Sequence, residues 1–139
     1  MYRAFFDTNI LAYEFDNSES SKQSVAVDLI NEWRPSGQMI ISTQVLQELY
    51  VVLTQKLRPA LKEGIAEEVI QNYSKLDVVV LEPSLILEGI GIKRRYKISF
   101  WDALIVAAAK DASCKVLFTE DLSHGMKIER VEIINPFLK

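Results

Sequence analysis

The sequence has very few of the residues on which several common kinds of active site depend. It contains one cysteine, Cys114, and one histidine, His124, in 139 residues. A single cysteine excludes an internal disulfide and a zinc site built from several thiolates. A single histidine excludes a ribonuclease that uses two histidines as acid and base, and a zinc site built from several imidazoles. We therefore expect a chemistry that depends on neither residue type, with His124 in a polar loop.

Glycine-rich phosphate loops and the serine motif of α/β hydrolases are also missing. Neither GxxxxGK[ST] nor GxGxxG occurs, because Gly89 and Gly91 lie in a helical pattern without a third glycine. No Gly-x-Ser-x-Gly nucleophile motif is present. For a hydrolase that has neither a second histidine nor this serine, metal-activated water is the natural nucleophile.

Long hydrophobic runs are absent as well, since none approaches the roughly 20 residues of a membrane-spanning helix. The segment 1–13 carries Asp7 where a secretion signal would need uninterrupted apolar residues. We therefore expect a cytoplasmic protein without membrane attachment. The formal net charge of −3 argues against a domain that binds nucleic acid through a basic surface alone. It is compatible with a nuclease whose acids gather in one cation-binding cleft.

A length of 139 residues with 49% hydrophobic and 25% charged residues is typical of one globular domain. Short runs rich in β-branched and aromatic residues predict buried strands at Arg3–Phe6, Met39–Ile41, Val78–Leu81, Val116–Phe118 and, as a fifth candidate, Val131–Ile134. Helical patterns occupy Ser20–Trp33, Thr43–Lys56, Pro59–Tyr73, Pro83–Tyr96 and Ser99–Asp111. The alternation predicts a single α/β domain over residues 1–139, with a parallel sheet of four or five strands flanked by helices.

Two acidic residues stand close to the ends of predicted strands. Asp7 comes directly after Arg3–Phe6, and Asp121 follows Val116–Phe118 after Thr119 and Glu120. Ligands of parallel α/β sheets gather beyond the carboxyl ends of the strands, so both carboxylates are expected in that crevice. The alternative for Asp7 is a cap of a following short helix.

Two further acids lie on predicted helices. Glu48 borders the apolar stripe of Thr43–Lys56, where a lone carboxylate is costly to bury, so it either has a metal or ionic partner or extends to solvent. Asp102 stands three residues after Ser99 in a capping-box pattern. The helix dipole keeps a carboxylate there ionised, so capping and metal binding are compatible.

These four acids offer oxygen ligands only, which favours Mg²⁺ or Mn²⁺ over softer metals. A basic run, Lys93-Arg94-Arg95-Tyr96-Lys97, precedes the Asp102 segment. It could guide an RNA backbone, with Tyr96 stacking on a base. The alternative is a solvated helix C-terminus, where the helix dipole favours cations.

Four segments resemble, in order, the motifs of the PIN-domain nucleases, and within them the VapC-type toxins of toxin–antitoxin pairs. The segments are Asp7-Thr8-Asn9-Ile10-Leu11, Ser42-Thr43-Gln44-Val45-Leu46-Gln47-Glu48, Ser99-Phe100-Trp101-Asp102-Ala103-Leu104-Ile105 and Leu117-Phe118-Thr119-Glu120-Asp121-Leu122. Together they cover nearly the whole chain.

The resemblance implies an endoribonuclease that depends on Mg²⁺ or Mn²⁺. The catalytic metal ligands would be Asp7, Glu48, Asp102 and Asp121. Asn9 and Thr119 would support them. An RNA substrate, a homodimer and a cognate antitoxin are implied as partners.

Three other functions are compatible with the same residues. PIN domains outside toxin–antitoxin pairs share the four motifs, and a degenerate domain could bind RNA or protein without cleaving. A phosphatase-like hydrolase with Asp7 as nucleophile is a more distant alternative, because such enzymes have a second Asp where this chain has Asn9.

Overall fold

A six-stranded sheet forms the centre of the structure, a computed structural model that describes residues 1–138. The strands are β1 Ala4–Phe6, β2 Met39–Ser42, β3 Asp77–Val79, β4 Val116–Phe118, β5 Lys127–Ile128 and β6 Val131–Ile134. Their order is β3-β2-β1-β4-β6-β5, and every neighbouring pair is parallel except β5 and β6. The predicted α/β class is confirmed, with six strands instead of four or five.

The strand that the sequence patterns missed is β5. It has two residues, one of them the exposed Lys127, so no apolar run marks it. A tight connection through Glu129 and Arg130, at φ values of +50° and +73°, returns the chain antiparallel into β6. The edge strand β3 is also shifted from the predicted Val78–Leu81, because the Leu81 N–H donates to Thr43 Oγ1 at 3.3 Å and leaves the sheet.

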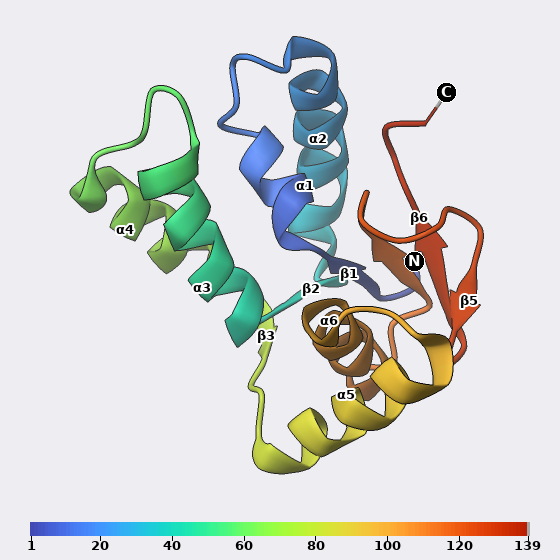
Figure 1. The fold of residues 1–139 in the computed structure, drawn as a ribbon. Helices are drawn as coiled ribbons and strands as arrows, with labels where there is room; N and C mark the ends of the chain where they lie inside the picture. The colour runs from blue at the N-terminus through green and yellow to red at the C-terminus, as the bar shows by residue number, and fades with distance from the viewer. Residues whose placement is uncertain (139) are drawn as a thin grey trace.

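Helical segments connect the strands. They are α1 Thr8–Tyr13, α2 Ser20–Trp33, the 3-10 helix η1 Arg34–Ser36, α3 Thr43–Val51, the π-helical turn η2 Val52–Lys56, α4 Glu63–Tyr73, α5 Pro83–Tyr96 and α6 Phe100–Asp111. Figure 1 shows α1 and α2 on one side of the sheet and α5 and α6 on the other, with α3 and α4 paired beside it.

The prediction of a helix that begins at Pro59 is wrong, because α4 begins at Glu63. The Arg58–Pro59 peptide is cis, and the Leu61 N–H donates to Leu53 O at 2.9 Å. The segment before α4 therefore folds back against η2. The short helix α1, which the sequence raised only as an alternative role for Asp7, is present.

One continuous apolar core holds the layers together. All residues of α6 from Ala103 to Ala109 are buried, as its nearly uniform apolar sequence predicted. On the opposite face, Trp33 of α2 packs edge-on against Phe6 and Phe118, at 6.2 and 5.8 Å between ring centroids. Within residues 1–138, no helix combines the length and hydrophobicity needed to cross a membrane.

Gly89 allows α5 and α6 to pack closely, because a Cβ there would lie 2.7 Å from Leu104 Cδ2. We expect Gly89→Val to lower the free energy of unfolding by about 1–3 kcal/mol, the usual cost of overpacking a buried contact. Gly64→Val in α4 is the control, since nothing lies within 4 Å of a Cβ at that position. Equal losses for both variants in urea denaturation would contradict this account of the helix contact.

Candidate metal centre

The carboxyl ends of β1 and β4 lie side by side, and an aspartate follows each strand. The two strands are parallel with Phe6 opposite Phe118, and the Asp7 N–H donates to Phe118 O at 3.0 Å. Asp121 is three residues beyond β4, in the loop that leaves the same edge. The adjacent carboxyl ends therefore bring Asp7 and Asp121 together, as parallel pairing predicts.

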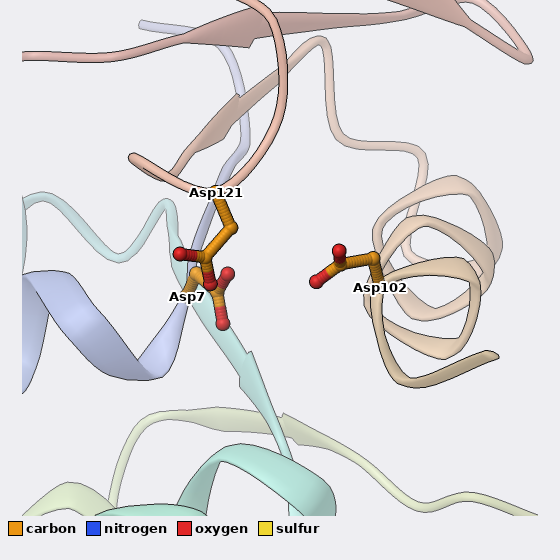
Figure 2. Close-up of side chains that lie close together, drawn as sticks. All are labelled: Asp7, Asp102 and Asp121. Atoms are coloured by element: carbon orange, nitrogen blue, oxygen red, sulfur yellow. The ribbon is translucent and has the colours of Figure 1, made fainter. Parts of the chain in front are cut away.

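Asp102 reaches the same place from the first turn of α6. Its N–H donates to Ser99 Oγ at 3.1 Å, so the predicted cap is confirmed. This cap uses the N–H of Asp102 and does not involve its carboxylate. Figure 2 shows the side chains of Asp7, Asp102 and Asp121 directed toward one shared space. One carboxylate oxygen from each lies within 4.8 Å of the other two.

These three carboxylates line a cavity of about 560 Å³, and Glu48 lines it as well. The Thr8 hydroxyl donates to Glu48 Oε1 at 2.9 Å. Among residues 1–138, Glu48 is not part of the group whose oxygens approach within 4.8 Å. The structure thus places all four predicted acids around one cavity, with three of them in a group whose oxygens lie within 4.8 Å of one another and Glu48 outside that group.

Asp7 is the most constrained of the four acids. Its Oδ1 accepts the Thr8 N–H at 2.7 Å, which caps α1, and its Oδ2 accepts the hydroxyl of the fully buried Thr119 at 2.7 Å. Asp7 therefore caps α1 and lines the cavity at the same time. Two fixed donors hold its carboxylate in one orientation.

Asn9 connects α1 with the loop after β4. Its amide nitrogen lies 3.0 Å from Asp121 Oδ2 and 3.4 Å from Thr119 Oγ1, and its Oδ1 accepts the Glu120 N–H at 3.4 Å. These contacts fix the Asp121 carboxylate relative to Asp7. Asn9 and Thr119, which were predicted to support the acids, thus form a hydrogen-bonded network with Asp7 and Asp121.

Burial makes a negative charge on Asp7 costly and raises its pKa to about 7. The hydrogen bonds from Thr119 and Thr8 oppose this shift, while the negative charges of Asp121 and Glu48 add to it. Burial also raises the pKa of Asp121, and the negative charge of Asp102 is the next cause. Desolvated acids that repel one another are stabilised in their charged form by a cation.

The donor set fits a hard divalent cation. All candidate ligand atoms are carboxylate oxygens, which suit Mg²⁺ and Mn²⁺ and offer nothing to metals that prefer thiolate or imidazole. The three acids come from separate segments: the end of β1, the loop after β4 and the start of α6. All three line the cavity, so a metal ion bound between them would face it.

Sequence reasoning missed several other residues of the cavity wall. Gln44, Lys56 and Trp101 line it. The Gln44 Nε2 donates to Trp101 O at 3.2 Å, whereas its buried Oε1 has no hydrogen-bond partner within residues 1–138. Two sequence signals were available: Gln44 lies one helical turn before Glu48, and Trp101 directly precedes Asp102.

The basic run lies at the C-terminal end of α5, and none of the residues Lys93, Arg94, Arg95 and Lys97 lines the cavity. Arg95 forms an ion pair with Glu129, and the Tyr96 hydroxyl donates to Glu129 Oε2 at 3.1 Å. Lys97, at φ +55°, ends the helix. The geometry matches the alternative of a helix C-terminus rich in cations, and RNA contact by this run stays a prediction.

His124 lies in an exposed turn, as expected for a loop residue. Its Nδ1 accepts the Asn135 N–H at 3.0 Å. His124 is not among the residues that line the acidic cavity.

Comparison with known proteins agrees with this geometry. A family model described as "PIN domain" matches residues 4–125, which include all four acids. A search of curated proteins gave no match.

Solved structures share the fold along most of their length. A toxin–antitoxin complex from Klebsiella pneumoniae has a TM-score of 0.71 and 22% identity, covering 96% of this chain and 97% of that one. The VapC20 toxin of Mycobacterium tuberculosis, described as cleaving the sarcin–ricin loop, has a TM-score of 0.67 and 20% identity over 85% of this chain and 91% of that one. DNA-bound VapBC from Salmonella typhimurium has a TM-score of 0.66 and 19% identity, covering 96% and 97%.

Proposed function

Because the chain belongs to the PIN domain family, we propose that it is a ribonuclease that depends on Mg²⁺ or Mn²⁺ and hydrolyses RNA phosphodiester bonds. The observation that carries this proposal is the group of three carboxylates whose oxygens lie within 4.8 Å of one another at the edge of the sheet. We further propose that it acts in the cytoplasm as the toxin of a toxin–antitoxin pair. Structural similarity to a toxin–antitoxin complex and to an RNA-cleaving toxin supports that role.

Asp7, Asp102 and Asp121 are assigned as the residues that hold the metal, and Glu48 as a further acidic ligand that lines the same cavity. A bound divalent cation would supply Lewis-acid activation of water and neutralise charge on the phosphoryl group. The acids supply the negative charge that retains it. Their fixed positions determine where the phosphate of the substrate lies relative to them.

The hydrogen-bonded network behind the acids prepares them for this task. Thr119 donates to Asp7, and Asn9 donates to Asp121. Each donor favours the charged form of its carboxylate and restricts its rotation. We assign Asn9 and Thr119 as positioning residues.

The direct test is cleavage of single-stranded RNA by the purified chain in Mg²⁺ or Mn²⁺. We expect products that vanish in excess EDTA and return when Mn²⁺ is added in excess of the chelator. Activity that survives EDTA undiminished would sink the proposal. Calorimetric titration with Mn²⁺ separates it from a degenerate binding domain, which would show no affinity for the metal.

Thr119→Val preserves the shape of the side chain and removes the hydroxyl that donates to Asp7. We expect metal affinity to fall by about tenfold or more, in the range typical for loss of a hydrogen bond to a metal-binding side chain. The physical cause is a further rise in the pKa of Asp7 together with a looser carboxylate. Thr54→Val is the matched control, because the Thr54 hydroxyl donates to Tyr50 O at 2.8 Å, away from the acids. Calorimetry with Mn²⁺ compares the two, and equal affinities would remove Thr119 from the positioning role.

An antitoxin partner and a homodimer belong to the same proposal. Helices α4 and α5 carry exposed apolar side chains at Ile65 and Leu87, which are available for a contact between two copies of the chain. Light scattering on the purified chain measures its mass. Growth arrest on expression, relieved by a co-expressed neighbouring gene, tests the toxin role.

A further inference from the structure

We propose that Trp101 and Lys56 form a nucleotide-binding subsite in the acidic cavity, which holds a nucleotide of single-stranded RNA beside the cleaved phosphodiester. The base would stack on Trp101, and Lys56 would contact a neighbouring phosphate. This inference rests on the proposed nuclease function and names residues beyond the four acids.

The cavity is larger than a metal site needs, and its lining is mixed. Its volume of about 560 Å³ falls within the range of small-molecule ligand sites. Besides the acids, the apolar side chains of Val51, Val52, Leu57 and Ile105 line it. Apolar walls with a few polar groups are typical of sites that take an organic ring.

Trp101 is 62% exposed, whereas the other tryptophan, Trp33, is 4% exposed and belongs to the core. The backbone of Trp101 is held in place because Trp101 O accepts a hydrogen bond from Gln44. The ring of Trp101 packs edge-on against Phe100, at 5.2 Å between ring centroids. A large aromatic ring exposed at the rim of a cavity is available to stack on a base. Because Trp101 directly precedes Asp102, a base stacked there belongs to a nucleotide next to the acids.

Lys56 supplies the one positive charge among the described residues that line the cavity. Within residues 1–138 it takes part in no ion pair. It follows Glu48 by two helical turns, a rise of roughly 12 Å along the α3–η2 segment. An RNA strand held at the acids through one phosphate can therefore meet Lys56 through another.

Five acids line the cavity against one lysine, so RNA enters once bound divalent cations offset the acids. The pairing of Trp101 with Lys56 then favours RNA over a protein segment. An aromatic face with a nearby free cation matches a base and its phosphate, and this pairing is the usual basis of single-strand recognition. Stacking works with every base, so the subsite positions the strand without requiring one sequence.

Tryptophan fluorescence gives a test that does not need cleavage. Six-residue oligouridine and oligoadenosine RNAs are titrated into the full chain in Ca²⁺, which also takes oxygen ligands. We expect both to quench the emission, because Trp101 is exposed and Trp33 is buried. Trp101→Phe should abolish the quenching, and an abasic strand with the same phosphates should not produce it. Quenching that persists in Trp101→Phe, or that the abasic strand reproduces, would overturn the proposal.

Kinetics in Mg²⁺ give the second test. Trp101→Ala should raise the KM for these RNAs by about tenfold, within the range measured for loss of one base–aromatic contact. The value of kcat and the affinity for Mn²⁺ should stay close to wild type, and Trp101→Phe should recover most of the loss in KM. Val80→Ala is the matched control, because Val80 is 61% exposed and does not line this cavity. A wild-type KM in Trp101→Ala would refute the stacking role.

The role of Lys56 has its own readout. Lys56→Ala should reduce the slope of log affinity against log salt by about one, as expected for loss of one phosphate contact, and Lys56→Arg should restore it. An unchanged slope in Lys56→Ala would refute the phosphate contact.

The two proposals can fail separately. If the wild-type chain cleaves no RNA, the nuclease function fails, while the fluorescence titration still decides whether RNA binds at Trp101. If the chain cleaves RNA and Trp101→Ala is indistinguishable from wild type, the subsite alone fails. Quenching by a basic peptide and by none of the RNAs would assign the cavity to a protein segment and overturn this inference.

Discussion

Asp7→Asn is expected to lower Mg²⁺-dependent RNA cleavage by more than about a hundredfold, because removing even an outer-shell partner of a metal ligand typically costs 10–100-fold. The substitution keeps the shape of the side chain and removes the charge that would hold the cation. The amide oxygen can still accept a hydrogen bond from the Thr8 N–H, so the cap of α1 is retained. Asp102→Asn should have a comparable effect on cleavage.

Cleavage of RNA and binding of Mn²⁺ are the two measurements for these variants. Asp28→Asn is the matched control, since Asp28 is exposed on α2 and does not line the cavity. Circular dichroism should show the same fold for all three variants. Wild-type cleavage by Asp7→Asn would contradict the assignment of Asp7 as a metal-holding residue.

Metal affinity is expected to depend steeply on pH. Because burial raises the pKa of Asp7 to about 7, a proton competes with the cation for this carboxylate in the neutral range. Below that pKa, each pH unit should weaken binding about tenfold, so that Mn²⁺ affinity falls by about a hundredfold between pH 7 and pH 5. The raised pKa of Asp121 shifts the affinity in the same direction.

The stability of the metal-free chain should show the corresponding trend. The pKa of Asp7 is higher in the folded protein than the ordinary value of 3.8, so the folded state binds this proton more tightly than the unfolded state. Its contribution to the free energy of unfolding is complete below about pH 4 and is lost as the pH rises through about 7. A concentration of divalent cation that saturates the site at pH 8 should restore stability at that pH and have little effect at pH 5.

Urea denaturation at a series of pH values measures this trend, with Asp7→Asn as the reference. The difference between wild type and this variant isolates the carboxyl group from all other titrating groups. Asp7→Asn should gain stability relative to wild type in EDTA as the pH rises from 4 to 8. A difference that does not change with pH would show that Asp7 has an ordinary pKa.

Local sequence patterns were sufficient to predict most of the elements. The ranges Val116–Phe118, Val131–Ile134, Ser20–Trp33 and Pro83–Tyr96 coincide with β4, β6, α2 and α5. These segments have strong apolar periodicity or uniform burial, which a single stretch of chain displays by itself. Elements set by distant contacts were missed. β5 exists only through its pairing with β6, and the start of α4 depends on the contact between Leu61 and Leu53.

Local patterns in the sequence were enough to predict most strands and helices, the all-oxygen set of candidate ligands and the places of these ligands near strand ends and on helices. They were enough because burial patterns, caps and strand ends are properties of neighbouring residues. The packing of distant segments was needed to show that Asp7, Asp102 and Asp121 meet within 4.8 Å and that Glu48 is not part of this group within residues 1–138. Only the fold, likewise, brought Trp101 and Lys56 to the same cavity. Such distances follow from how parallel strands align and how α6 packs against them, and no local pattern encodes that packing.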